Sequence, residues 1–126
     1  MNSPEQTVRE IVGAADDDPI IKLCDALCWE ATKRGWDLFH IEPDGHIRSQ
    51  TNGVWREEMT LPPKMAPRLV RRFKVIAQLD MIHNPPEQAG SARFLVNGTP
   101  FETNVRVRRA GSGEESALIE FVHAAA

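Results

Sequence analysis

The feature of this sequence that most limits its fold is a run in which mostly apolar side chains alternate with polar or charged ones. Phe101, Thr103, Val105 and Val107 alternate with Glu102, Asn104, Arg106 and Arg108. A period of two places the first set on one face of a β-strand and the second set on the other. Asn97-Gly98 precedes the run and is typical of a tight hairpin turn. The pattern therefore predicts an antiparallel hairpin of residues 93–96 and 101–108, with one buried and one solvated face.

Further short segments also have the character of strands. They cover residues 37–42, 46–51, 54–59 and 117–122. Pro43-Asp44-Gly45 and Asn52-Gly53 supply turns between the first three. In the first strand we expect Phe39 and Ile41 to point one way and His40 and Glu42 the other. The Pro-rich stretch 83–90 is expected to be a loop.

Two segments have helical periodicity instead. The first begins at Pro19, after a capping Asp18, and ends before Gly35. Its apolar positions are Ile20, Leu23, Cys24, Leu27, Cys28 and Ala31. The second helix is expected over residues 66–79, with an apolar face of Ala66, Leu69, Val70, Phe73, Ile76 and Ala77. The order helix, three strands, helix, three strands predicts an α+β domain: an antiparallel sheet of about six strands with helices packed on one face.

A chain of 126 residues fits one domain. Residues 1–18 hold five acidic side chains and one arginine, and we expect them to be an acidic leader, flexible or a short helix. Residues 19–123 form the predicted domain, and residues 124–126 a frayed tail. No apolar run approaches the ~20 residues of a membrane helix, and no signal peptide is apparent. We therefore expect a cytoplasmic protein without membrane insertion.

The residues that would indicate catalysis are absent or scattered. There is no Gly-x-x-x-x-Gly-Lys-Ser/Thr loop to hold nucleotide phosphates. Cys24 and Cys28 are expected to be small buried apolar side chains, because the histidines offer no metal-ligand spacing. His40 and Glu42 could form an acid–base pair, but the polar face of a half-exposed strand accounts for them better. No catalytic residue, cofactor or metal is predicted, and the chain is not expected to be an enzyme.

The order and spacing of several segments resemble a known family. Residues 30–35 read Glu-Ala-Thr-Lys-Arg-Gly, and residues 36–43 read Trp-Asp-Leu-Phe-His-Ile-Glu-Pro. Residues 47–55 read Ile-Arg-Ser-Gln-Thr-Asn-Gly-Val-Trp, and 71–81 read Arg-Arg-Phe-Lys-Val-Ile-Ala-Gln-Leu-Asp-Met. A Gly-Glu pair at 113–114 then precedes an apolar run. Together, over residues 19–122, they resemble the domain that precedes the ATPase core in type II secretion and type IV pilus assembly ATPases of the GspE/PilB type.

The resemblance implies a PAS-like α+β fold beside a RecA-like ATPase domain in a bacterial hexameric motor. It also implies that arginines of this domain approach the nucleotide. Several of those arginines are missing, because the sequence has Gln-Thr-Asn-Gly at 50–53 and lacks arginine throughout 83–91. Arg48 and Arg106 remain at family positions. Neutral side chains cannot replace guanidinium groups at a phosphate, so the nucleotide-facing role is expected to be lost.

These observations predict a non-catalytic protein-interaction or assembly module. Its expected partner is a secretion or pilus ATPase, or another component of that machine, which would bring it to the inner membrane. The candidate interaction surface is the basic face of the second helix, with Arg68, Arg71, Arg72 and Lys74. A homo-oligomer is left open, and nucleic-acid binding is not expected. Two alternatives stand: an N-terminal fragment of a longer secretion ATPase, and a PAS-like small-molecule sensor.

Overall fold

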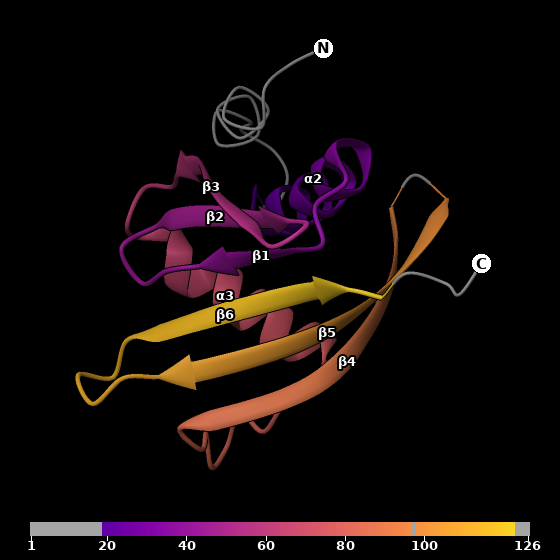
Figure 1. Cartoon of the computed structure of the whole chain (residues 1–126). Coiled ribbons are helices and arrows are strands. Elements are labelled where there is room, and N and C mark those ends of the chain that lie inside the picture. Colours follow the sequence, from indigo (N-terminus) through magenta and orange to yellow (C-terminus); the bar gives the residue numbers. More distant parts are fainter. Residues whose placement is uncertain (1–18, 97, 123–126) are drawn as a thin grey trace.

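The computed structural model describes residues 19–96 and 98–122, and it contains two helices and six strands there (Figure 1). The helices are α2 (Pro19–Arg34) and α3 (Met65–Ile76). The strands are β1 (Leu38–Ile41), β2 (His46–Thr51), β3 (Val54–Thr60), β4 (Glu87–Val96), β5 (Thr99–Arg109) and β6 (Glu115–Phe121). The predicted α+β class and element order are confirmed. The leader 1–18 and the tail 124–126 lie outside the described residues.

The six strands form one antiparallel sheet in the order β3-β2-β1-β6-β5-β4. The first and last strands of the chain therefore lie side by side at its centre, with Leu38 opposite Glu120 and Ile41 opposite Ala117. Each hairpin, β2–β3 and β4–β5, extends the sheet outward from this central pair (Figure 1). Strands β3 and β4 are the two edges.

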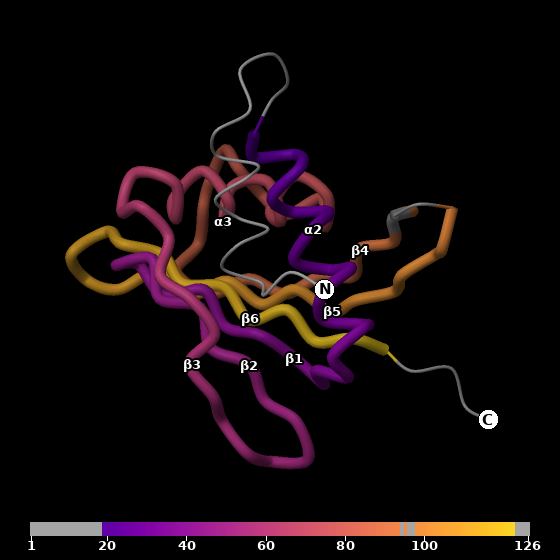
Figure 2. Tube along the Cα trace, turned by 90° about the horizontal axis from the view of Figure 1, so that it is seen from above, coloured from indigo at the N-terminus to yellow at the C-terminus, as the bar shows by residue number. Residues whose placement is uncertain are grey.

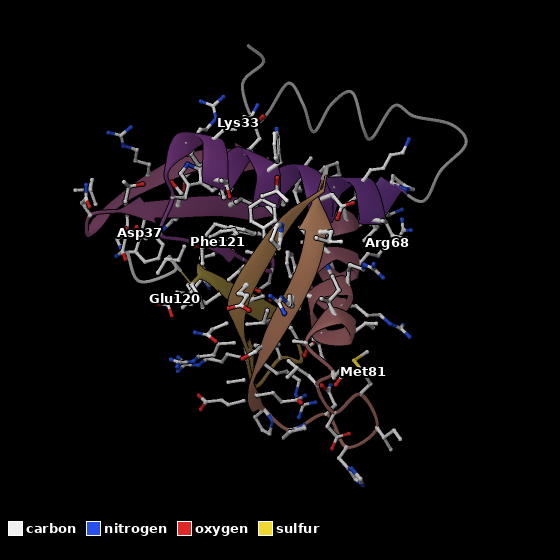
Figure 3. All side chains as sticks on the ribbon, turned by 90° about the vertical axis from the view of Figure 1, so that its right-hand side faces the viewer. Lys33, Asp37, Arg68, Met81, Glu120 and Phe121 are labelled. Carbon is white, nitrogen blue, oxygen red and sulfur yellow. The ribbon has the colours of Figure 1, made fainter. Side chains whose placement is uncertain are left out.

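Both helices cover the same face of the sheet, as the view from above shows (Figure 2). Phe39 of β1 is fully buried at the centre of the resulting core. Its ring lies 6.0 Å from that of Trp36 and 5.9 Å from those of Phe73 and Phe121. On β6, Phe121 is directed toward the helices and Glu120 away from them (Figure 3). The sheet is thus amphipathic, and no helix of residues 19–96 and 98–122 covers its second face, called the helix-free face below.

The alternation predicted for β5 is confirmed. Phe101, Thr103, Val105 and Val107 are buried, and the polar residues between them are exposed. The buried hydroxyl of Thr103 donates a hydrogen bond to the carbonyl oxygen of Ala92 at 3.2 Å, which satisfies it inside the core. No helix in the described part of the chain is long and apolar enough to cross a membrane.

Most predicted boundaries agree with the structure within two residues, and two differ by more. Helix α3 ends at Ile76 instead of residue 79, because Gln78 adopts a left-handed conformation with φ of 56°. The N–H of Leu79 then bonds back to the carbonyl of Lys74 at 2.9 Å, as in a Schellman-type helix end. Strand β4 begins at Glu87, inside the stretch expected to be a loop. Gly90 suits this position, because an added Cβ would lie 2.8 Å from Leu79 Cδ2 and 3.0 Å from the carbonyl oxygen of Ala77.

Candidate functional site

The helix-free face of the sheet gathers polar side chains from five strands. The strand register places Glu57, Arg48, His40, Leu118 and Arg106 in one row across β3, β2, β1, β6 and β5. Arg48 and Arg106, the two arginines that the resemblance singled out, therefore lie on the same face. Three inter-strand spacings separate them, or about 14 Å between backbones. This arrangement depends on the central pairing of β1 with β6.

Arg48 is held by two carboxylates. Its Nε lies 2.9 Å from Glu57 Oε1 and 3.4 Å from Glu42 Oε1. His40 Nδ1 is 3.9 Å from Glu42 Oε1, too long for a hydrogen bond. Burial lowers the pKa of His40, the Glu42 carboxylate opposes this shift, and the Arg48 charge adds to it. This geometry favours the polar-face interpretation of His40 and Glu42 over an acid–base pair.

Two adjoining hollows occupy this face. One of about 320 Å³ is lined by His40, Trp55, Arg106, Arg108, Ser116 and Leu118. The other, of about 410 Å³, is lined by His40, Glu42, Pro43, Asp44, Arg108, Ala110, Glu114 and Ser116. Arg108 is paired with Glu87 at 3.0 Å, whereas Arg106 has no ion pair within residues 19–96 and 98–122. The indole of Trp55 is half exposed nearby.

Sequence reasoning did not single out Trp55 or Arg108 as parts of a site. Both lie in strands whose polar faces looked like ordinary solvated surface. The signal that could have found them is the strand order, because it joins β3 and β5 in one sheet, on opposite flanks of the central β1–β6 pair. The alternation of apolar and polar residues along a strand shows which face of the sheet each side chain is on. It does not show which side chains of other strands lie next to it.

The candidate surface on α3 needs two corrections, at Lys74 and at Arg72. Arg68 and Arg71 are exposed, and Figure 3 shows Arg68 directed away from the sheet. Lys74, in contrast, is only 3% exposed. Its Nζ donates to Asn84 Oδ1 at 2.6 Å and to Glu115 Oε2 at 2.9 Å. It lies one turn after the buried Val70 on the core-facing stripe, so it does not belong to an exposed basic surface.

Arg72 is also partly withdrawn from solvent. Its Nε is buried without a hydrogen-bond partner in the described part of the protein. Its charge acts on Asp25 of α2, whose pKa is raised by burial, with Arg72 partly offsetting the rise. Arg72 therefore faces the helix–helix contact, and the exposed cations of this surface are Arg68 and Arg71.

Potential metal ligands gather at one turn. Side-chain ligand atoms of Glu42, Asp44 and His46 lie within 4.8 Å of one another. His46 Nδ1 is 3.2 Å from Asp44 Oδ2, and Arg48 Nε is 3.4 Å from Glu42 Oε1. Contacts with the Arg48 guanidinium and the His46 ring thus account for these two carboxylates.

The two cysteines are not part of this site. Cys24 and Cys28 are buried and free, as predicted. Burial raises the pKa of the Cys28 thiol, and the neighbouring Cys24 raises it further. A thiol with a raised pKa is a poor metal ligand and a poor nucleophile.

A third hollow lies at the far end of the β2–β3 hairpin, beside the end of α2. Its volume is about 550 Å³, and it is lined by Arg34, Trp36, Ser49, Thr51, Asn52, Val54, Arg56 and Glu58. Within it the Ser49 hydroxyl donates to Glu58 Oε1 at 2.8 Å. Its lining mixes both charges, so it does not select one ligand class.

Sequence and fold comparisons give these features a context. No family model matches the chain. It is 33% identical over 113 residues to type II secretion system ATPase E of Vibrio cholerae, covering 87% of this chain and 22% of that protein. It is 30% identical over 96 residues to type IV pilus assembly ATPase PilB of Myxococcus xanthus, covering 74% of this chain and 17% of that protein. The chain matches the N-terminal domain of these ATPases.

The fold agrees with this assignment. The ADP-bound pilus retraction motor PilT superposes with a TM-score of 0.56 over 80% of this chain and 29% of PilT, at 15% sequence identity. The chain spans about a fifth of the length of the curated relatives that it matches. The match covers their N-terminal segment and not the catalytic core. Their ATPase activity is therefore a property of longer proteins.

Proposed function

We propose that this chain is a non-catalytic assembly module of a type II secretion or type IV pilus machine, and that it docks on the machine's ATPase at the cytoplasmic side of the membrane. The homology to the N-terminal domain of such ATPases supports this role. The observation that carries the proposal is the helix-free face of the sheet, which combines apolar and arginine side chains. We assign docking to this face.

The composition of the face suits a protein partner. Antiparallel sheets can expose one face to water, but such faces are usually polar. Here Leu118 is half-buried and Trp55 is 50% exposed. Tryptophan and arginine are enriched where protein interfaces gain most of their binding energy. Arg106 and Trp55, which line the same hollow, therefore provide the centre of a docking surface for a partner with an exposed carboxylate.

The non-catalytic part of the proposal rests on missing chemistry. The sequence has no Walker-type loop to hold phosphates, and arginine is absent from residues 50–53 and 83–91. Of the two arginines at family positions, Arg48 is already neutralised by Glu57 and Glu42. Purified protein is expected to hydrolyse no ATP. Turnover that persists in the purified chain would contradict this proposal.

A binding experiment separates the two candidate surfaces. The immobilised chain is titrated with a purified type II secretion ATPase of the type it matches. Arg106→Glu on the helix-free face is expected to weaken binding at least tenfold, and Arg71→Glu on α3, a matched charge change, by less than threefold. The reverse order would move the docking surface to α3. Absence of binding by the unaltered chain would refute the assembly role.

A second candidate function is favoured by the small part of the relatives' length that this chain matches. Because the chain spans about a fifth of their length, it could also serve as the N-terminal part of a longer secretion ATPase. The helix-free face would then face the core of the same polypeptide. Coding sequence downstream of Ala126 that contains a Walker-type loop would establish this alternative, and a stop codon there would exclude it.

A further inference from the structure

Strand β4 is an outer strand whose second edge has no partner in the described part of the protein. It is the lowest strand in Figure 1, with no strand beyond it. Among residues 19–96 and 98–122, its backbone hydrogen bonds lead only to β5. Ten residues leave a free edge of about 33 Å. Such an edge is a template for another strand.

The other outer strand, β3, is protected against pairing with itself. Its centre carries Arg56, Glu57 and Glu58. An antiparallel copy that matched Arg56 with Glu58 would also place Glu57 opposite Glu57, and like charges directly opposite are destabilising. Strand β4 has no charge between Glu87 and Arg93. This difference indicates that β4, and not β3, can accept a second copy.

The two charges that bound this neutral stretch are complementary. In an antiparallel pair of β4 strands centred on Gly90, Glu87 of each copy lies opposite Arg93 of the other. Both side chains are on the helix-free face, because Glu87 is paired with Arg108 and Arg93 with Glu102 across the strand register. The ion pairs within the chain measure 3.0 Å and 3.4 Å between Nε and Oε1. The second copy would extend them into a row of alternating charges.

Small side chains let the two backbones meet at the centre. Ala89 and Ser91 flank Gly90, and they are the two side chains that stand between Glu87 and Arg93 on the helix-free face. We propose that β4 pairs in antiparallel fashion with β4 of a second copy, so that one continuous sheet spans both. This inference is independent of the docking proposal, because the helix-free face stays open in the pair. The contact is mostly backbone hydrogen bonds and two ion pairs, so self-association in the micromolar range is expected.

A charge exchange tests the register directly. Sedimentation velocity between about 1 and 500 μM should show a concentration-dependent dimer. Glu87→Arg alone and Arg93→Glu alone should each weaken it at least tenfold, since each places like charges opposite. An equimolar mixture of the two variants should recover it, because a strand with two arginines then faces a strand with two glutamates. Arg56→Glu on β3 is the matched control and should leave the dimer unchanged.

Circular dichroism should show that all variants remain folded, because the exposed pairs that they break contribute little to stability. A monomer at every concentration overturns the proposal, as does a dimer that survives both single changes. Monomeric single variants that stay monomeric when mixed overturn the Gly90-centred register. These measurements use the chain alone, so their failure is separate from failure to bind an ATPase.

Discussion

The ion pair between α3 and β6 joins two side chains that differ in burial, so removing one or the other should have different costs in stability. Lys74 is 3% exposed, and its ammonium lies 2.9 Å from Glu115 Oε2. The Glu115 side chain is 23% exposed. Neutralising Glu115 leaves a buried positive charge with only Asn84 to accept a hydrogen bond. Removing Lys74 leaves a carboxylate that can reach water.

The expected magnitudes follow from this asymmetry. Removing one partner of a buried pair costs about 3–5 kcal/mol when the remaining charge is fully enclosed. Since Asn84 remains as an acceptor, we expect Glu115→Gln to cost about 2–4 kcal/mol. Lys74→Met should change stability by less than about 1.5 kcal/mol, because its stem is already packed and a thioether fills the space. The double variant should be more stable than Glu115→Gln alone.

Urea unfolding followed by circular dichroism measures these differences. A loss of about 3 kcal/mol should also lower Tm by about 10 °C or more in a chain of this size. The four proteins form a double-mutant cycle, whose coupling energy isolates the pair. The reasoning is refuted if Lys74→Met costs more than Glu115→Gln, or if Glu115→Gln costs less than about 0.5 kcal/mol.

Three further outcomes can be checked. Gly90→Ala should destabilise the fold by about 1–3 kcal/mol in the same urea unfolding assay, because its Cβ would meet Leu79 Cδ2 at 2.8 Å and the carbonyl oxygen of Ala77 at 3.0 Å. Gly111→Ala is the control and should be nearly neutral, because nothing lies within 4 Å of its Cβ. Burial lowers the pKa of His40, so the unfolded state binds the proton more readily and the free energy of unfolding should fall as pH drops below about 6.5. His40→Asn should flatten this part of the stability–pH profile. A wild-type profile with no such slope would contradict the burial argument. ATP, ADP and cyclic dinucleotides at millimolar concentration should leave Tm unchanged in a thermal shift assay, and a saturable rise would favour the sensor alternative.

Local sequence patterns were enough to predict most elements of this fold. Strand β5 is predictable because one buried face enforces a strict period of two over residues 101–108. Strand β4 was predicted too short, because Ala89-Gly90-Ser91 has no alternation of its own and pairs only because β5 extends alongside. The end of α3 was placed too late, since the left-handed Gln78 is not a glycine and gives no stop signal.

The candidate site was less accessible to sequence reasoning. Lys74 was assigned to an exposed surface from its charge, although its spacing from Val70 places it on the buried stripe. Burial of a lysine depends on Glu115 arriving from a strand forty-one residues away. The meeting of Arg48, Trp55 and Arg106 on one face depends on strand order, which is a property of the whole chain.

The position of β6 between β1 and β5 has a consequence for how this sheet assembles during synthesis. Until residues 115–121 are available, β1–β3 and β4–β5 share no strand contact within the described part of the chain, because β6 alone joins them. Bringing such distant segments together costs loop-closure entropy, and only the strand contacts made afterwards offset that cost. The domain should therefore fold late, after its last strand has left the ribosome. A chain ending before residue 115 should be more prone to proteolysis, because among the described residues only helix contacts then connect its two groups of strands.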